Sequence, residues 1–286
     1  MTTRDKETGV VLVNVLVVLA VAGGLMLLLV NSQDAVLGRV SRSADASIVE
    51  QIALGAEASV IDALRRDLDD APEIDHLNEA WALDVIQDEI KLPTGIFSLQ
   101  IRDLQARFNI NQMAAITAGT QDFARRLMIA LDQSPETANE IGRILKAVGP
   151  VQYLNALSEF GISQEAINAM APYVTALPIN GTINLNSVDP FLLAVMLQND
   201  SHASQLVHMR ERQGSLSLET LLGAGVLRPQ NSGFTSNAYR VDILAEAGSA
   251  RLQVQTVVIR RNDPGVKSVE ILERRFVYVG PDGGGM

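Results

Sequence analysis

The chain has 286 residues, of which 47% are hydrophobic and 20% are charged, a composition typical of a folded protein and unlike that of a disordered one. It carries 23 Lys and Arg against 33 Asp and Glu, a net charge of -10, which argues against a protein that coats nucleic acid through clustered cations. There is no cysteine, so disulfide scaffolds, cysteine-ligated metal sites and thiol nucleophiles are excluded.

An uncharged apolar segment lies near the N-terminus, at residues 10–30. It reads VVLVNVLVVLAVAGGLMLLLV, and Asn14 is its only strongly polar residue. A helix of about 20 residues crosses a bilayer core, so this segment is long enough to span a membrane. Arg4 and Lys6 precede it. The positive-inside rule then places the N-terminus in the cytoplasm and the residues after the helix outside the cytoplasm. We expect one transmembrane helix.

The junction before this helix resembles a processing signal. Residues 5–9 read DKETG, and the apolar run begins at once with Val10. A short charged leader, a glycine and an apolar helix are similar to the signal of type IV pilins and type II secretion pseudopilins. The resemblance implies that a prepilin peptidase cleaves between Gly9 and Val10 and that the new amino terminus is methylated. These families usually begin the mature chain with Phe or Met, so Val10 departs from the pattern.

The fifth residue after the expected cleavage is Asn14, where most pilins and pseudopilins have Glu. A carboxylate inside a membrane helix is costly and persists only when it is paired. In those families its implied partner is the ammonium group of the subunit above, which a subunit at the tip lacks. In having no Glu at this position, the chain resembles the K-type minor pseudopilins, which are proposed to cap the assembly. Asn14 is therefore the candidate assembly residue.

The helical period continues beyond the membrane segment. Apolar residues follow one another at steps of four, at Ile48, Ile52, Ala56, Val60, Leu64 and Leu68. We place Glu50, Glu57 and Asp62 on the other faces and end the helix at Ala71-Pro72. A helix from residue 10 to 69 would be roughly 90 Å long, and it resembles the spine of a pilin.

The rest of the chain changes its period twice. Alternation over residues 96–101 predicts a strand. Residues 109–227 give helical signals, with helix starts at 134–136, 163–165 and 186–189. Alternation then returns, and we expect strands at 239–243, 252–258, 269–271 and 276–279. This order predicts an α+β fold in which a helical subdomain is inserted into an α/β head.

Four local motifs resemble the K-type minor pseudopilin family of type II secretion, in the same order. They are FNIN at 108–111, PYVTALP at 172–178, INLNS at 183–187 and SNAYR at 236–240. The resemblance covers nearly the whole chain. It implies a long N-terminal transmembrane and amphipathic helix packed on a small antiparallel sheet, with an all-helical insert in the head. One departure is that residues 144–160 lack the longer aspartate-rich stretch common in the family.

The resemblance also sets the expected domain boundaries. They are a leader at 1–9, a transmembrane helix at 10–30, an amphipathic helix at 31–70, the first part of the head at 71–108, the helical insert at 109–231 and the second part of the head at 232–286.

No motif or cluster of residues in the sequence indicates a catalytic site. His76, His202 and His208 are scattered, and the sequence has no Walker loop, no Gly-x-Ser-x-Gly elbow and no dinucleotide-binding fingerprint. The pair Asp84 and Asp88 is one helical turn apart, as on many charged helix faces. We expect the single Trp81 to pack a helix against the sheet. We do not expect this chain to be an enzyme.

Some members of the resembling family bind calcium, which takes several oxygen ligands. The sequence has no DxDxDG loop, and its acidic run at 67–75 is typical of a solvated helix end. We therefore expect no metal and no cofactor; a calcium site is implied by the resemblance alone, with ligands that the sequence does not identify.

The insert has a second resemblance, to helix-hairpin-helix modules that bind DNA phosphates. Residues 183–187, a helix and then residues 217–222 follow that pattern. Such modules need a glycine-rich hairpin whose amides approach the phosphates. The corresponding hairpin at 198–202 has no glycine and adds Asp200. DNA binding is therefore the weaker interpretation.

Taken together, these features imply a non-catalytic minor pseudopilin of type II secretion, anchored in the inner membrane with its head in the periplasm and placed at the pseudopilus tip. The implied partners are other minor pseudopilins, the prepilin peptidase, the inner-membrane secretion platform and secreted cargo, with no nucleic acid. Two alternatives stay open: a minor pilin of a type IV pilus, and a membrane-tethered helix-hairpin-helix DNA-binding protein.

Overall fold

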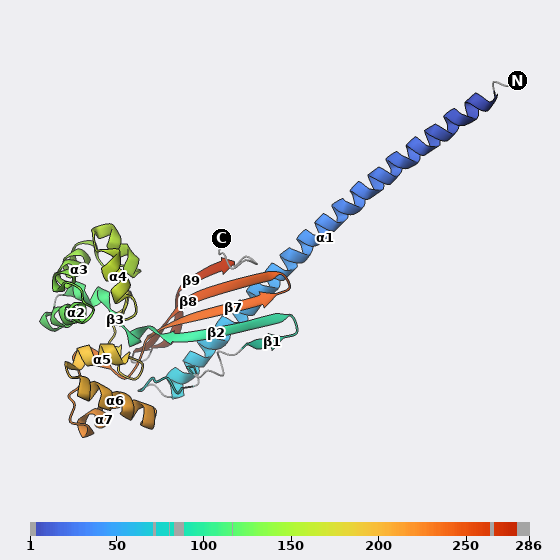
Figure 1. Ribbon diagram of the computed structural model, residues 1–286. Coiled ribbons are helices and arrows are strands. Elements are labelled where there is room, and N and C mark those ends of the chain that lie inside the picture. Colours follow the sequence, from blue (N-terminus) through green and yellow to red (C-terminus); the bar gives the residue numbers. More distant parts are fainter. Residues whose placement is uncertain are drawn as a thin grey trace.

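The computed structural model describes residues 4–70, 73–79, 81–82, 89–115, 117–263 and 266–278, without the side chains of residues 4–13, 35 and 263. A long helix leads from the N-terminus to a sheet, and a group of helices lies at the far end of that sheet (Figure 1). The predicted helix end at Ala71-Pro72, the pair Asp84 and Asp88, and residues 279–286 lie outside the described residues.

Helix α1 runs without interruption from Arg4 to Asp70, over 67 residues, which corresponds to roughly 100 Å. We expected it to begin at Val10, but it starts before Gly9 and takes in the end of the leader. Its N-terminal half projects away from the rest of the protein, and its C-terminal half lies along the sheet (Figure 1).

The sheet is antiparallel and has five strands in the order β1-β2-β7-β8-β9. The strands are β1 (Ile90–Leu92), β2 (Gly95–Asp103), β7 (Ala238–Ala247), β8 (Ala250–Asp263) and β9 (Val266–Tyr278). The strand predicted at 96–101 is confirmed as β2. The two closing strands predicted at 269–271 and 276–279 form one continuous strand, β9, opposite a register shift at Val257 and Val258 of β8.

The core of the head lies between α1 and one face of the sheet. Val49, Ala53 and Leu64 of α1 are fully buried against alternate residues of β7 such as Val241 and Ile243. Leu64 lies on the stripe that the step of four predicted, and Val49 and Ala53 lie directly beside that stripe. Trp81 joins the same core, as expected, and its ring meets that of Tyr239 edge to face, with centroids 5.0 Å apart.

Glu57, which we placed on another face of the helix than the apolar stripe, is also buried. Its side chain is only 3% exposed, and its carboxylate accepts a hydrogen bond from Arg274 Nε at 3.0 Å and one from the Thr256 hydroxyl. The helical period could not show this, because the covering residues come from β8 and β9, about 200 positions away along the chain.

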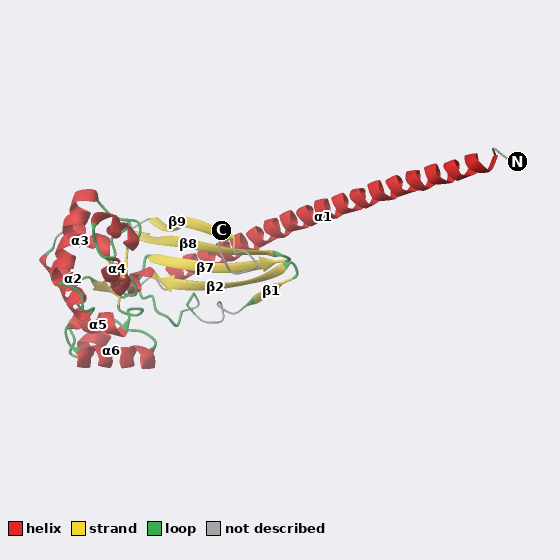
Figure 2. Ribbon diagram, turned by 45° about the horizontal axis from the view of Figure 1, so that its top comes forward, coloured by secondary structure: helices red, strands yellow, loops and turns green. Residues whose placement is uncertain are grey.

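The inserted subdomain occupies the chain between β2 and β7 and gathers at one end of the sheet (Figure 2). Its α-helices are α2 (Ala118–Ala130), α3 (Pro135–Val148), α4 (Gln164–Met170), α5 (Pro190–Leu197), α6 (Asp200–Gln213) and α7 (Leu218–Gly223). Its 3-10 helices are Leu104–Ala106, Ile110–Ala115 and Leu154–Phe160.

Each predicted helix start in the insert carries the expected cap. Ser134 caps α3 with Pro135 in the first turn, Ser163 caps α4, and Asp189 caps α5 ahead of Pro190. The insert builds its own hydrophobic core, separate from that of the head. The α+β fold, with a long apolar N-terminal helix, an antiparallel sheet and helices, is as expected.

Candidate functional site

The expected site residues at the N-terminus lie along the projecting half of α1. Gly9 and Val10 are within this helix, although their side chains lie outside the described residues, and Asn14 is exposed. Large apolar side chains stay exposed well beyond them, including Val36, at 45%, and Leu37, at 66%. The structure does not bring Gly9, Val10 or Asn14 close to the head.

Among the described residues, one helix is long and apolar enough to cross a membrane. It is α1, and none of its most apolar window is buried against the protein. An exposed apolar helix of this kind needs either lipid or the apolar helices of partner subunits around it. The projecting half of α1 is therefore the first candidate functional surface.

The four sequence motifs converge at the base of the insert. There β3 (Phe108–Asn109) pairs in parallel with β4 (Val174–Thr175), and β5 (Ile183–Asn184) pairs with β6 (Ser232–Gly233). These pairs are the only strands within an otherwise helical part of the described insert. The side chain of Asn109 holds the end of the second motif, because its Nδ2 donates to the Ile179 carbonyl at 2.8 Å and its Oδ1 accepts from the Leu177 amide at 3.0 Å.

Asn184 joins the insert to the head. It is fully buried, and its Nδ2 lies 3.0 Å from both the Asp75 carbonyl and Asp103 Oδ2. Ser236 also donates to Asp103 Oδ2, at 2.5 Å, and its amide donates to Asp75 Oδ2 at 2.7 Å. Burial raises the pKa of Asp103, although hydrogen bonds from Ser187, Ser236, Asn184 and the Gln105 amide oppose the shift.

Arg260 of β8 completes this junction. Its guanidinium is 1% exposed and pairs with Asp75 and, through Nη1 at 2.6 Å, with Asp67. It also lies 5.3 Å from the centroid of the Tyr239 ring. The acidic run at 67–75 is therefore a solvated helix end only in part: Asp69, Asp70 and Glu73 are exposed, as the sequence suggested, but Asp75 is fully buried. Arg260 and its neighbour Arg261 follow the strand predicted at 252–258, and this local sequence gave no signal of the partnership.

Asp67, Asp75 and Glu79 place carboxylate oxygens within 4.8 Å of one another, the one such acidic group among the described residues. This group fits a calcium ion poorly, because Arg260 already supplies positive charge to two of the three carboxylates. Glu79 Oε2 accepts from Trp81 Nε1 at 2.5 Å and from the His76 amide at 3.2 Å. Burial raises the pKa of Glu79 to about 7, which disfavours the charged carboxylate that a calcium ion would need.

The hairpin between α5 and α6 lacks the geometry of a phosphate site. Asn199 caps α6 by accepting from the His202 amide at 3.0 Å, and Asp200 adds negative charge to the first turn. Arg210 is directed inward, where its Nη1 donates to the carbonyls of Leu185 at 3.1 Å and Val188 at 2.9 Å. The chain therefore resembles a helix-hairpin-helix module in the packing of its helices and not in a phosphate-binding hairpin.

Comparison with known proteins supports the first resemblance. No protein-family model matches the chain. It is 26% identical over 278 residues to Type II secretion system protein K of Pectobacterium carotovorum subsp. carotovorum, covering 80% of this chain and 83% of that protein. It is also 26% identical over 249 residues to Type II secretion system protein K of Pseudomonas aeruginosa, covering 74% of each chain.

A solved structure has the same fold. A chain in the crystal structure of the GspK-GspI-GspJ complex from the enterotoxigenic Escherichia coli Type 2 Secretion System matches with a TM-score of 0.61 and 17% identity, covering 83% of this chain and 99% of that chain. The resemblance to the K-type minor pseudopilins of type II secretion, which the leader and four motifs indicated, is thereby confirmed over most of the chain.

Proposed function

We propose that this chain is a minor pseudopilin of a type II secretion system. The observation that carries the proposal is its similarity to protein K along about three quarters of its length. The protein would be a non-catalytic subunit whose apolar half of α1 lies in the inner membrane and whose head and insert lie in the periplasm. The exposed apolar surface of α1 supports this placement.

The position of the insert supports a capping role. The helical insert lies at the end of the sheet opposite the projecting half of α1, so it adds bulk at the end farthest from the membrane (Figure 1). We infer that a further subunit could stack above this chain only by occupying the space at this end of the head. A subunit with the insert in that position would stop the stack, and Asn14 fits a subunit that has no neighbour above it.

The partners follow from the same proposal. The related protein K was crystallised in a complex with GspI and GspJ, and we propose that this chain binds other minor pseudopilins in the same manner. Residues 31–47 of α1 would supply the contact, since Val36, Leu37 and Val40 are exposed there. The prepilin peptidase would process the chain at Gly9 and Val10, and the inner-membrane platform and secreted cargo are further proposed partners.

The absence of cysteine makes the partner interface simple to map. Leu37→Cys places one thiol on the proposed interface, and Leu227→Cys places one on the insert, where the side chain is 82% exposed. Co-expressed with minor pseudopilins that carry a cysteine in their own helices, the first variant is expected to form a disulfide-linked heterodimer and the second is not. Cross-links from Leu227→Cys alone would contradict the proposed interface.

The capping role has a separate test. Gold coupled to the thiol of Leu227→Cys is expected to mark one end of each overproduced pseudopilus in electron micrographs. Label spaced along the filaments would refute capping while leaving membership of the pseudopilus intact.

A further inference from the structure

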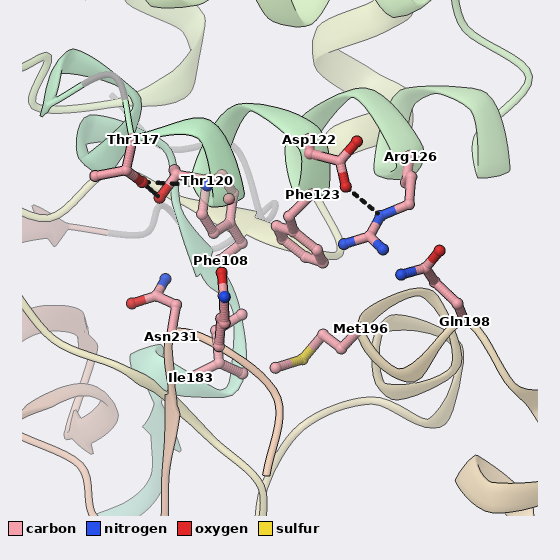
Figure 3. A pocket seen from close by; sticks show the side chains of 12 residues that line it. Phe108, Thr117, Thr120, Asp122, Phe123, Arg126, Ile183, Met196, Gln198 and Asn231 are labelled. Carbon is pink, nitrogen blue, oxygen red and sulfur yellow. Dashed lines mark hydrogen bonds and ion pairs between the residues drawn. The ribbon is translucent and has the colours of Figure 1, made fainter. Parts of the chain in front are cut away.

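A cavity of about 520 Å³ opens in the insert between α2 and the turn that links α5 to α6 (Figure 3). One part of its lining is apolar, formed by Phe108, Phe123, Ile183 and Met196. The polar part includes the guanidinium of Arg126 and the side-chain amides of Gln198, Gln230 and Asn231. Polar groups make up the larger part of the lining and stand beside this apolar patch, so a ligand that fits the cavity combines polar groups with one apolar group.

Arg126 holds a buried hydrogen-bond donor that has no partner among the described residues. Its side chain extends from α2 toward Gln198, across the space above Met196 (Figure 3). Its Nε is buried and has no hydrogen-bond partner among the described residues. Asp122 Oδ2 lies 3.6 Å from that atom, too far for a hydrogen bond, and the Asp122 side chain is 64% exposed. A solvated pair of this kind holds the guanidinium weakly.

The backbone around the cavity takes uncommon conformations. Gln198 and Asn231 have φ values of 52° and 57°, in the left-handed region that favours glycine. Gln198 takes this conformation as the residue that ends α5, and the two residues fix the backbone on one side of the cavity. Gly119 contributes in a different way: a Cβ there would lie 2.3 Å from Gln230 Oε1, so only glycine lets this amide lie against the start of α2.

We propose that this cavity binds an extended peptide through one carboxylate and a neighbouring apolar side chain. Arg126 would bind the carboxylate, since a guanidinium presents paired donors that match two carboxylate oxygens. The two phenylalanines and Met196 would receive the apolar side chain, and the three amides would hydrogen-bond to peptide groups. A multiply charged ligand fits less well, because Arg126 is the one cation among the described residues of the lining and Asp122 partly offsets it.

The carboxylate could be that of a chain terminus or of an aspartate. Three probes separate these sources: N-acetyl-Ala-Leu-Phe as the free acid, the same peptide as its amide, and N-acetyl-Asp-Leu-Phe amide. Binding to the full chain in detergent micelles is measured by calorimetry. We expect saturable binding of at least one acidic probe at submillimolar concentration, and at least tenfold weaker binding of the neutral amide. The acidic probe that binds identifies the source.

Variants of one helix supply the controls. Arg126→Gln is expected to weaken binding of the acidic probe at least tenfold, whereas Arg125→Gln, on the exposed side of α2, leaves it unchanged. Asp122→Asn removes the competing carboxylate and is expected to tighten binding severalfold. The proposal is overturned by the absence of saturable binding, by equal binding of acidic and neutral probes, or by equal binding to Arg126→Gln and Arg125→Gln when circular dichroism shows both to be folded.

Discussion

Arg260 neutralises two carboxylates in the junction between head and insert. It lies between Asp67 and Asp75, and Asp75 has no access to solvent. Removing one partner of a buried ion pair leaves the other charge uncompensated, at a cost of about 3–5 kcal/mol. Because the two carboxylates come from the end of α1 and the segment after it, loss of the arginine would loosen the head at the point where the insert is attached.

We therefore predict that Arg260→Met lowers the free energy of unfolding by about 3–5 kcal/mol, measured by urea denaturation in detergent. The neighbouring Arg261→Met is the matched control, because the Arg261 side chain is 56% exposed. Surface changes of that kind stay within about 0.5 kcal/mol. Equal stability of the two variants would show that Arg260 does not organise the junction.

Glu79 is expected to make the stability of the protein depend on pH. Burial raises its pKa from 4.5 to about 7, with Asp67 and Asp75 adding to the effect. Between these two values the folded protein binds more protons than the unfolded chain, so the free energy of unfolding falls as the pH rises through that window. Burial also raises the pKa values of Asp67 and Asp103, which act in the same direction.

The variant Glu79→Gln is expected to flatten the fall in melting temperature between pH 4.5 and 7, measured by circular dichroism, without abolishing it. Glu50→Gln, at an exposed position of α1, is the control and should keep the slope of the parent protein. A slope in Glu79→Gln as steep as that of the parent would remove Glu79 as its source.

At the scale of elements, the two halves of α1 have different tasks. Leu64 is fully buried against the sheet, whereas Leu37 is 66% exposed on the projecting half. Truncating a buried leucine costs about 2–5 kcal/mol, because a cavity remains in the core. Leu37 lies outside the core between α1 and the sheet, so the same truncation there leaves no cavity in that core.

Leu64→Ala is thus expected to lower the free energy of unfolding of the head by about 2–5 kcal/mol, and Leu37→Ala to leave it unchanged. Leu37→Ala should instead reduce the yield of complexes recovered with other minor pseudopilins. Chemical denaturation and co-purification measure the two effects. A loss of stability in Leu37→Ala would mean that this part of α1 packs on its own chain.

The elements were largely predictable from local signals. Apolar residues at steps of four predicted the buried stripe of α1, and the serine caps at 134 and 163 predicted two helix starts. The continuity of β9 was not predictable, because Ile271 to Arg275 do not alternate and pairing with β8 holds them in the sheet. The burial of Glu57 and Asp75 depends likewise on residues far along the chain, and no local period encodes such contacts.

For the whole molecule, the sequence indicated a head with an insert but not how the two are joined. In the sequence, the four motifs indicated only a resemblance to a family. The structure places them in two parallel strand pairs and a buried polar network around Asn184 and Asp103. The cavity beside Arg126 had no sequence signal, because its lining comes from segments more than 100 residues apart. Gly9, Val10 and Asn14 remain predictions from the leader motif.

The central claim is that the chain is a processed pseudopilin, and the intact mass of the membrane-extracted protein tests it most directly. The chain is expressed with and without a prepilin peptidase, and Gly9→Leu serves as the variant that blocks cleavage. We predict that the peptidase removes residues 1–9 and that one methyl group is added to Val10, with neither change in Gly9→Leu. A chain that keeps its residues 1–9 in the presence of an active peptidase would contradict the account.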